Sequence, residues 1–469
     1  MTTDTVDKLT SLRAALGDIE ITDTPPAYLE DPRGRFQGQA LGLVRPRSTE
    51  DVAQVVRAAA ANRVPVVPYG GGTGLVGGQV SWDGPPPLII SLERMSGIRS
   101  VLTDEALLIA EAGAVLKSVQ EAAAAAGLLF PLSLASEGSA RIGGLLATNA
   151  GGVNVLRYGN ARDMCLGLEA VMPDGSIWNG LKRLRKDNTG YDLRNLLIGS
   201  EGTLGIITAA TLRLFPQPAS HATAMLIVDS PKAALSLLSA ARAHVGEQVS
   251  AFELIAGQGL EFLRETLPDV RLPFDAIPPW CVLIDLGLAA RQDGQAALET
   301  LFTMGQENGW VTGGVIAVSE AQRQSLWSVR EHIPQGNCRI GAIASHDVSL
   351  PLSAVPDFIE DARAELTGTS DLRINCFGHL GDGNLHFNLF PAKGRDRKDY
   401  DHQRHVLIRT VHDLVHAYGG SISAEHGIGR LKTSDLERYS DPTKLAAMRA
   451  IKHALDPHSI MNPGAVIRH

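Results

Sequence analysis

The sequence predicts an α+β protein with more than one domain. Its 469 residues exceed what one hydrophobic core usually organises, so two or three domains are expected. Between residues 218 and 425, apolar strands alternate with alanine-rich helices, which is typical of an antiparallel sheet covered by helices. The 48 glycines are clustered rather than evenly spread. We therefore divide the chain into domains 1–217 and 218–425 and a C-terminal segment 426–469.

The first domain begins with recognisable helix and strand signals. Ser48 and Asp51 form a capping box at the start of a helix that we expect to end at Asn62. A short apolar strand follows at 64–69, and a second helix is expected to end at Gly127, since glycine is the usual residue after a helix C-terminus.

The second domain shows a clearer alternation. Strands are predicted at 224–228 and 280–284, and helices at 231–243 and 295–308. Another helix is predicted over 402–418, and a short helical tail closes the chain.

A β-hairpin is predicted close to the end of this domain. Asp382 and Gly383 form a tight-turn dipeptide between two short apolar segments. His386 and Asn388 then share one face of the second strand, because side chains alternate with a period of two. His379 lies on the opposing strand near the turn, close enough to converge with them.

This hairpin contains the ingredients of a divalent-metal site. Two imidazoles, His379 and His386, bracket the turn, and the carboxylate of Glu425 follows in a Glu-His-Gly sequence. Two histidines and one carboxylate that leave coordination positions open are typical of a catalytic site rather than a closed structural one. Such a site can lower the pKa of a bound hydroxyl, which belongs either to water or to a substrate.

Charge and hydropathy exclude several classes of protein. The net charge is 43 − 51 = −8, without a dense block of Lys and Arg, which argues against a nucleic-acid partner. No apolar run approaches the roughly 20 residues that span a bilayer. The acidic, polar N-terminus argues against a signal or transit peptide. We expect a cytoplasmic protein that is not integral to a membrane, and peripheral attachment to a membrane stays open.

The loop from Gly70 to Gly78 contains a formal GxGxxG pattern at Gly72, Gly74 and Gly77. A Rossmann fingerprint must open directly into a helix, and the three prolines that soon follow this loop exclude one. The loop also lacks the lysine of a P-loop. Its unhindered backbone N–H groups favour a nest for a pyrophosphate, and a flexible surface loop is the alternative.

Three glycine-rich segments, Pro68–Leu75, Ile142–Gly152 and Gly199–Ile207, resemble the FAD-binding domain of the vanillyl-alcohol oxidase superfamily. The C-terminal motifs narrow the resemblance to its D-2-hydroxyacid dehydrogenase branch, which contains D-2-hydroxyglutarate dehydrogenases, D-lactate dehydrogenases and glycolate oxidase large subunits. The similarity runs from about Tyr28 to Val466, with the motifs in the expected order.

This resemblance implies a two-part FAD-binding domain, an α+β substrate (cap) domain with an antiparallel sheet, and a C-terminal helical tail that returns to the FAD domain. Covalent members attach flavin through a histidine, often in the first glycine loop, where this chain has none, so non-covalent FAD is expected. For single glycines of the middle segment, close backbone packing is an alternative role. The residues implied to bind FAD are Gly70, Gly71, Gly72, Thr73, Gly74, Gly143, Asn149, Gly151, Gly152, Ile206 and Asn462.

The same resemblance assigns roles to the polar residues. The implied metal ligands are His379, His386 and Glu425, with Zn²⁺ preferred and Mn²⁺ or Fe²⁺ also compatible. His426 matches the general base, a role that suits an imidazole near neutral pH. Arg330 matches the arginine that binds the substrate carboxylate, and Asn388 would hydrogen-bond the substrate.

Two positions depart from the hydroxyglutarate-specific pattern. Ser345 stands where relatives often have a lysine, and Pro334 stands where they have a threonine. Both residues contribute to holding a distal carboxylate in the relatives. Their loss makes D-lactate or a larger 2-hydroxy acid at least as good a candidate as D-2-hydroxyglutarate.

We therefore expect FAD-dependent oxidation of a D-2-hydroxy acid to the 2-keto acid. The hydride passes to flavin N5, a divalent metal activates the hydroxyl, and His426 removes its proton. A metal-dependent hydrolase and a non-catalytic flavin subunit of a larger oxidase complex are the alternatives. The electron acceptor is open among oxygen, a quinone, an electron-transfer flavoprotein and a cytochrome, and a homodimer is one open oligomeric state.

Overall fold

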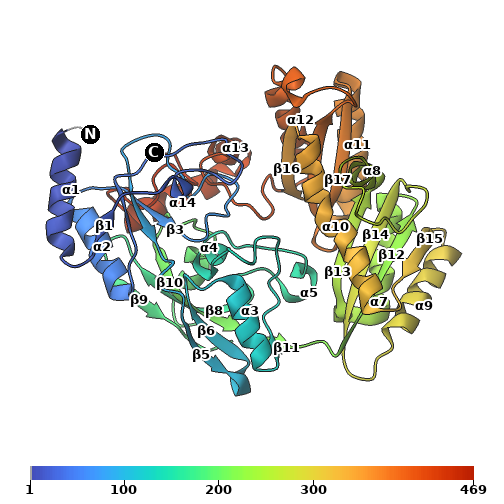
Figure 1. Cartoon of the computed structure of the whole chain (residues 1–469), viewed down its shortest axis with the longest axis horizontal. Helices are drawn as coiled ribbons and strands as arrows, with labels where there is room; N and C mark the ends of the chain where they lie inside the picture. Colours follow the sequence, from blue (N-terminus) through green and yellow to red (C-terminus); the bar gives the residue numbers. More distant parts are fainter. Residues whose placement is uncertain (1–2, 469) are drawn as a thin grey trace. The chain divides into compact units, whose positions relative to one another are not determined.

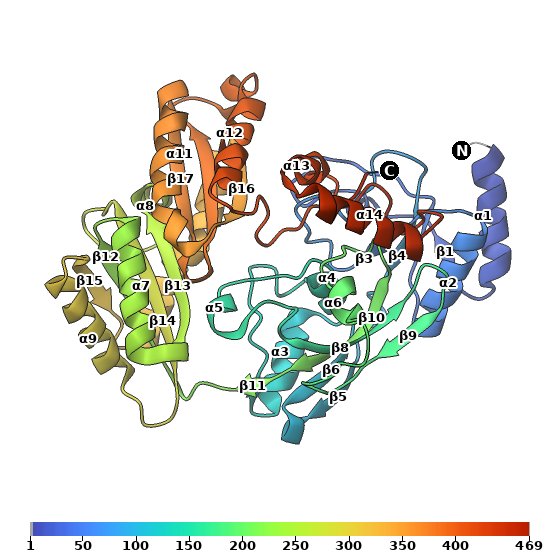
Figure 2. The same cartoon turned by 180° about the vertical axis from the view of Figure 1, so that it is seen from behind.

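The computed structural model describes residues 3–468, which form two compact units (Figures 1 and 2). Of the described residues, the first unit comprises 3–152, 159–217 and 425–468. The second comprises residues 218–424 together with the short insertion 153–158, which forms helix α5 (Val155–Tyr158). The chain therefore enters the second unit twice.

A four-stranded sheet begins the first unit, in the order β1-β2-β4-β3. β2 and β3 both run parallel to β4, and β1 pairs antiparallel with β2. The strand predicted at 64–69 is β3. The strands of this sheet are β1 (Ile21–Thr22), β2 (Gly42–Val44), β3 (Val66–Tyr69) and β4 (Leu88–Ser91).

The second sheet of this unit has five strands in the order β5-β6-β10-β8-β9 and is antiparallel throughout. A separate two-stranded pair joins β7 to β11. The strands are β5 (Ile98–Leu102), β6 (Leu107–Glu111), β7 (Leu128–Leu129), β8 (Cys165–Val171), β9 (Ile177–Gly180), β10 (Ile206–Arg213) and β11 (Phe215–Pro216).

Helix α2 of the first unit begins and ends at the signals predicted from the sequence. Ser48 caps α2, since its hydroxyl accepts from the backbone N–H of Asp51, and Asn62 follows the last helical residue. The carboxylate of Asp51 accepts from Arg47 instead, so the cap is not reciprocal. The helices are α1 (Thr3–Leu16), α2 (Thr49–Ala61), α3 (Leu116–Ala125), α4 (Ile142–Ala147), α6 (Leu193–Leu197), α13 (Thr433–Tyr439) and α14 (Pro442–Leu455), with 3-10 turns η1 (Pro26–Tyr28) and η2 (Thr103–Glu105).

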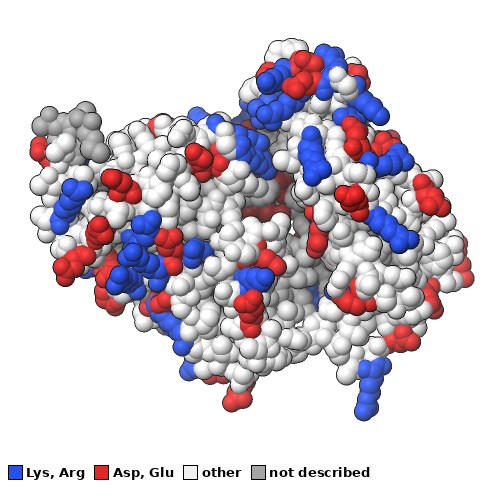
Figure 3. Space-filling view, in the orientation of Figure 1, with Lys and Arg blue, Asp and Glu red and all other residues white. Residues whose placement is uncertain are grey.

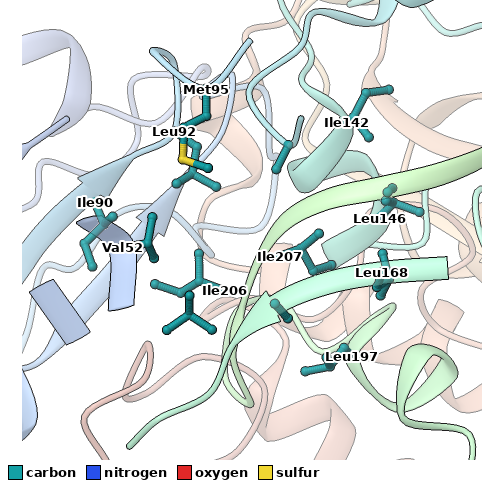
Figure 4. Close-up of a cluster of buried hydrophobic side chains, with 14 of the residues drawn as sticks. Val52, Ile90, Leu92, Met95, Ile142, Leu146, Leu168, Leu197, Ile206 and Ile207 are labelled. Atoms are coloured by element: carbon teal, nitrogen blue, oxygen red, sulfur yellow. The ribbon is translucent and has the colours of Figure 1, made fainter. Parts of the chain in front are cut away.

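One hydrophobic core joins the two larger sheets of the first unit. Figure 4 shows part of it, with Val52 from α2, Ile90 from β4 and Leu168 from β8. Burying one such side chain stabilises the fold by about 1.5–3 kcal/mol.

The C-terminal tail belongs to this same unit. The backbone N–H of Val66 donates to Ile460 at 2.8 Å, and that of Asn462 donates back to Val66 at 2.8 Å. A parallel bridge between Val66 and Met461 extends the first sheet by one position. The predicted return of the tail to the first domain is therefore confirmed.

The second unit is built on a seven-stranded sheet in the order β15-β12-β14-β13-β17-β18-β16, in which every neighbouring pair is antiparallel. The predicted α+β class with an antiparallel sheet is confirmed. The strands are β12 (Ser220–Val228), β13 (Val249–Ala256), β14 (Trp280–Leu288), β15 (Val311–Ile316), β16 (Ala344–Ser349), β17 (Leu372–His379) and β18 (Asn384–Pro391).

Helices cover both faces of this sheet. α8 and α10 pack on the face that holds Ile255 and Phe377, and Figure 1 shows α10 in front of the strands. α7 and α11 lie on the opposite face and are seen in front in Figure 2. The helices are α7 (Pro231–Val245), α8 (Gly257–Thr266), α9 (Gly294–Glu307), α10 (Glu320–Ile340), α11 (Val355–Thr369) and α12 (Arg404–Ala417), with 3-10 turns η3 (Gly246–Gln248), η4 (Leu352–Ala354), η5 (Leu380–Asp382) and η6 (Arg397–Tyr400).

The surface carries both signs of charge. On the face that Figure 3 shows, Lys and Arg side chains are interspersed with Asp and Glu side chains rather than joined into one broad basic area. Among the described residues, no helix is both long enough and apolar enough to cross a bilayer.

Candidate active site

The predicted hairpin is formed by β17 and β18, in which Phe377 pairs with His386. Its connection is longer than a two-residue turn, since η5 precedes Gly383. Gly383 has φ +82°, and a Cβ there would lie 2.2 Å from the carbonyl oxygen of Leu350. Only glycine fits this position, so Gly383 sets the turn that brings the two strands together.

The turn places two imidazoles next to each other. The ring centroids of His379 and His386 are 5.7 Å apart, with the ring planes at 77°. His379 is buried and His386 is partly buried. Asp347 is paired with His386 across β16 and β18, and its Oδ1 lies 3.8 Å from Nδ1 of His386. Strand pairing therefore fixes both histidines, since the backbone of His386 pairs with β16 and β17 and that of His379 pairs with β13.

Glu425 joins these histidines directly after the second unit. The backbone N–H of Ala424 donates to Asp347 at 3.2 Å, so the chain is still attached to β16 one residue earlier. One ligand atom from each of His379, His386 and Glu425 lies within 4.8 Å of the others. The structure thus brings the three predicted ligands together.

The donor set fits a divalent cation. Zinc–ligand bonds of about 2.0–2.2 Å place two donors on one ion no more than ~4.4 Å apart, so a small side-chain movement closes the set. Two imidazole nitrogens and one carboxylate oxygen suit Zn²⁺, Mn²⁺ or Fe²⁺, and three ligands leave coordination positions for a substrate.

Glu253 is a further residue of this site that the sequence pattern did not indicate. Its Oε1 lies 2.6 Å from Nδ1 of His379, and its Oε2 accepts from Nε of Arg330 at 2.7 Å. Burial alone would raise the pKa of Glu253, but the adjacent His379 and Arg330 outweigh it and lower the pKa to about 2. The one available signal was a carboxylate in the mostly apolar segment Val249–Ala256.

Arg330 and Asn388 lie on the same side of the sheet. Arg330 is buried on α10, with its guanidinium carbon 4.8 Å from the centre of the Phe377 ring. Asn388 is next but one to His386 on β18, and its Oδ1 accepts from the backbone N–H of His346 at 3.2 Å. Because the carbonyl end of this amide is held by the sheet, its NH₂ end is the one that can meet a substrate.

The two departures from the hydroxyglutarate pattern flank this face. Ser345 pairs with Asn388 across the two strands and is exposed. Pro334 lies inside α10, one turn after Arg330, and is also exposed. Neither side chain carries a charge, so neither can form an ion pair with a carboxylate, although the Ser345 hydroxyl can donate a hydrogen bond.

In the first unit, the three glycine-rich segments adjoin one another. A Cβ on Gly70 would lie 3.4 Å from Cα of Gly144, so the first loop touches the middle segment. The backbone N–H of Gly199 donates to Leu146 at 3.0 Å, and that of Glu201 donates to Ala147 at 2.8 Å. No helix occurs in the loop that links β3 to β4, in agreement with the exclusion of a Rossmann fingerprint.

Several of the predicted cofactor glycines are required by packing. A Cβ on Gly71 would lie 2.1 Å from the carbonyl oxygen of Ser139, and one on Gly152 would lie 2.0 Å from that of Ser133. A Cβ on Gly143 would lie 2.7 Å from Cβ of Ala112. Backbone packing alone therefore explains glycine at these three positions, and the N–H of Gly143 is already used, since it donates to the carbonyl of Ala112 at 2.8 Å.

Asn462 ties the C-terminal tail to the glycine segments. Its Nδ2 donates to the carbonyls of Gly78 at 3.0 Å and Glu201 at 2.8 Å. Arg430, which the sequence pattern did not indicate, donates to Oδ1 of Asn462 at 2.9 Å and to the carbonyl of Gly77 at 3.1 Å. Burial lowers the pKa of Arg430 to about 10. The side chain of Asn462 thus connects the C-terminal tail to the first glycine loop and to the third glycine-rich segment.

The segment after His426 is held by Glu201. The carboxylate of Glu201 accepts from the backbone N–H groups of Ile428 at 2.7 Å and Gly429 at 2.8 Å. His426 itself is partly buried and directly follows the metal-ligand candidate Glu425. These bonds fix the backbone on the C-terminal side of the predicted base.

Two predicted cofactor residues have other structural roles as well. The side chain of Ile206 is buried in the hydrophobic core that Figure 4 shows, so only its backbone remains for a cofactor. Asn149 has a left-handed backbone with φ +51°, and its Oδ1 accepts from the N–H of Arg162 at 3.0 Å. Of the remaining predicted positions, Thr73, Gly72, Gly74 and Gly151 are all partly exposed.

Comparisons with known proteins match both units. The model of the FAD-linked oxidase C-terminal domain covers residues 217–466, and that of the FAD binding domain covers 40–180. The chain is 38% identical over 462 residues to a D-2-hydroxyglutarate dehydrogenase of Xanthomonas citri pv. viticola, covering 97% of this chain and 96% of the relative. It is 35% identical to the mitochondrial D-2-hydroxyglutarate dehydrogenase of Arabidopsis thaliana, covering 93% of this chain and 76% of the relative.

Solved structures show the same fold at much lower identity. Substrate-bound p-cresol methylhydroxylase matches with a TM-score of 0.77 at 15% identity, covering 100% of this chain and 98% of that one. Alkyldihydroxyacetonephosphate synthase matches with a TM-score of 0.68 at 18% identity, covering 92% and 77%. The chain therefore belongs to the FAD-linked oxidases of the vanillyl-alcohol oxidase superfamily and is an FAD-dependent enzyme of the D-2-hydroxyacid dehydrogenase branch.

Proposed function

We propose that this enzyme oxidises its D-2-hydroxy acid with the help of a divalent cation held by His379, His386 and Glu425. The observation that carries the proposal is the convergence of these three ligand atoms within 4.8 Å in a chain of an FAD-dependent family. When bound, FAD would supply the hydride acceptor and the cation would lower the pKa of the substrate hydroxyl. Family membership favours this reaction over hydrolysis.

Three side chains then handle the substrate. Arg330 binds the carboxylate, because a planar guanidinium can form two parallel hydrogen bonds with it. Asn388 donates from its amide to a substrate oxygen. His426 accepts the hydroxyl proton as C2 loses its hydride, so one hydride and one proton leave and the 2-keto acid forms.

The identity of the D-2-hydroxy acid depends on how many carboxylates the site can hold. The curated relatives are named D-2-hydroxyglutarate dehydrogenases, which supports a substrate with two carboxylates. The neutral residues Ser345 and Pro334 beside the site support an acid with one carboxylate. We propose D-2-hydroxyglutarate and D-lactate as the two acids to compare first.

Two further features of the reaction follow the same reasoning. Thr73 and its neighbouring glycines offer no histidine for a covalent bond, so FAD is held non-covalently. The electron acceptor, whether an electron-transfer flavoprotein, a quinone, a cytochrome or oxygen, is identified by following reoxidation of the reduced enzyme with each in turn.

Anaerobic flavin bleaching tests the proposal. The metal-replete enzyme is mixed with D-2-hydroxyglutarate, D-lactate and their L-enantiomers, and the flavin absorbance is followed. We expect a D-acid to bleach the flavin, and both chelation and His426→Ala to slow the bleaching by roughly 10²–10⁴-fold. If chelation leaves the rate unchanged, the metal-assisted mechanism is wrong, and if no D-2-hydroxy acid bleaches the flavin, the proposed reaction is wrong.

A further inference from the structure

One buried carboxylate, that of Glu253, contacts two groups with different proposed tasks. Each of its oxygens has one partner, His379 at 2.6 Å and Arg330 at 2.7 Å. Glu253 is fully buried, and its backbone is paired with that of His379 across β13 and β17. The sheet therefore holds the carboxylate and the imidazole in fixed register.

The contact with His379 selects one form of the imidazole. A carboxylate only accepts hydrogen bonds, so Nδ1 of His379 carries the hydrogen that faces Glu253. In the neutral ring, the lone pair then belongs to Nε2. A carboxylate behind a metal-ligating histidine fixes the tautomer and strengthens the ligand in this way.

The contact with Arg330 fixes the plane of the guanidinium. Glu253 accepts from Nε, and the Phe377 ring lies 4.8 Å from the guanidinium carbon. With Nε used, the edge formed by the two Nη groups is the one that can meet a second carboxylate in a bidentate manner.

We propose that Glu253 is a positioning residue that holds the metal ligand His379 and the carboxylate-binding Arg330 together, so that cation affinity and substrate affinity depend on one side chain. This inference rests on the proposed metal-dependent function. It goes beyond that function because it couples two binding events through a residue that touches neither the cation nor the substrate.

The geometry explains why a carboxylate is required here. Glutamine has the same size, but its amide offers one acceptor and one donor. In either orientation of Glu253→Gln, one of the two N–H groups that now donate to Glu253 would face an NH₂ group. His379 could relieve the clash only by moving its hydrogen to Nε2, where it blocks ligation.

The test measures binding of Co²⁺ alone to chelator-stripped, FAD-loaded enzyme. We expect Glu253→Gln to weaken Co²⁺ binding by roughly 10–100-fold and to change the visible cobalt spectrum. At saturating Co²⁺, the KM for the acid that bleaches the wild-type flavin should still rise, because in either orientation of the amide Arg330 no longer faces an anionic partner.

Asp285→Asn is the matched control. Asp285 is a buried carboxylate on the adjacent strand β14 that also contacts α10, through Nε1 of Trp327 at 3.3 Å. We expect wild-type Co²⁺ affinity in this variant. Equal loss of Co²⁺ in both variants would mean general damage to the sheet and would overturn the inference.

A measurement on wild type tests the inference even if the Glu253→Gln variant does not fold. In metal-free wild type, ¹⁵N shifts should show a hydrogen on Nδ1 of His379 and a lone pair on Nε2, and the opposite tautomer would overturn the inference. If wild type binds Co²⁺ and Glu253→Gln binds it equally well, the inference alone fails. If wild type does not bind Co²⁺, the proposed function fails and the inference fails with it.

Discussion

The glycine segments of the first unit and the polar sheet face of the second unit build their sites in opposite ways. In the first, Gly71, Gly143 and Gly152 are required because any added carbon would meet a neighbouring backbone or side-chain atom. What this region offers a ligand is backbone N–H groups. In the second, Glu253 and His379 act through side chains whose positions are set by strand pairing.

This difference separates the two kinds of damage that a substitution can do. In the glycine region, the volume of a substituted side chain decides the damage, whatever its charge. On the sheet face, the damage depends on which side-chain atoms donate and which accept hydrogen bonds. We therefore expect substitutions in one region to remove flavin and those in the other to remove the cation, each without the other effect.

The largest expected effect follows from removing a metal ligand. His386→Ala should lower the rate of flavin reduction at least ~10³-fold, because the hydroxyl loses the cation that acidifies it. Its flavin content should stay at the wild-type level. Metal analysis, flavin absorbance and single-turnover reduction measure the three quantities. His405→Ala, an exposed histidine on α12, is the control and should match wild type. Loss of flavin in His386→Ala would contradict the expectation that substitutions on the sheet face remove the cation and leave flavin bound.

The converse effect comes from the first glycine loop. Gly71→Val places a side chain against the carbonyl oxygen of Ser139, 2.1 Å from the Cβ position, and should cost about 3 kcal/mol of stability, near the upper end for overpacking. Flavin should be lost on gel filtration while Co²⁺ binding is retained. Gly138→Val is the control, because a Cβ there has open space and φ is not positive. A flavin-replete Gly71→Val enzyme would contradict the close packing.

The same contrast explains how much could be predicted from the sequence. The glycine segments were recognisable because each motif is local, and the hairpin was recognisable because Gly383 lies between two apolar strands. His379 and His386 were found together because one turn connects them. Local signals of this kind predicted the antiparallel sheet and the three metal-ligand candidates, whereas the return of the tail to the first domain was implied by the family resemblance.

Glu253 could not be predicted by the same means. Its partners Arg330 and His379 are 77 and 126 residues away in the sequence. Only the strand order β13-β17-β18 and the packing of α10 on that face bring them together. Arg430 was missed for the same reason, since its partner Gly77 is 353 residues away.

A smaller effect is expected from a change that keeps the charge of the carboxylate-binding residue. Arg330→Lys retains the positive charge but replaces a planar fork by a single ammonium, so bidentate binding is lost. The KM for the substrate acid should rise roughly 10–100-fold, equivalent to about 1.4–2.8 kcal/mol. Co²⁺ affinity should change much less than in Glu253→Gln, because the carboxylate still fixes His379. A KM equal to wild type would show that Arg330 does not bind the carboxylate.

The smallest expected effect compares buried glutamates of the two units. Glu169 of β8 accepts from Thr49 at 2.6 Å, Thr208 at 2.9 Å and Arg99 at 3.1 Å. Burial alone would raise the pKa of Glu169, but these donors outweigh it and the pKa is lowered. A lowered pKa in the folded state means that the stabilisation is complete above the ordinary pKa of glutamate and is lost as the pH falls through the folded value.

The free energy of unfolding of wild type, measured in urea, should therefore fall as the pH drops below the ordinary glutamate pKa. Glu169→Gln should have a lower free energy of unfolding at neutral pH, and that free energy should change less on acidification. Glu253, whose pKa is lowered to about 2, should by the same reasoning keep its stabilisation to lower pH. Tryptophan fluorescence cannot assign the loss to one unit, so hydrogen exchange of β8 and β13 measures it separately. Equal acid sensitivity of Glu169→Gln and wild type would show that Glu169 does not carry the effect. In that case Thr49 holds α2 to β8, and Thr208 of β10 keeps its bond within the sheet, whether or not the carboxyl group is ionised.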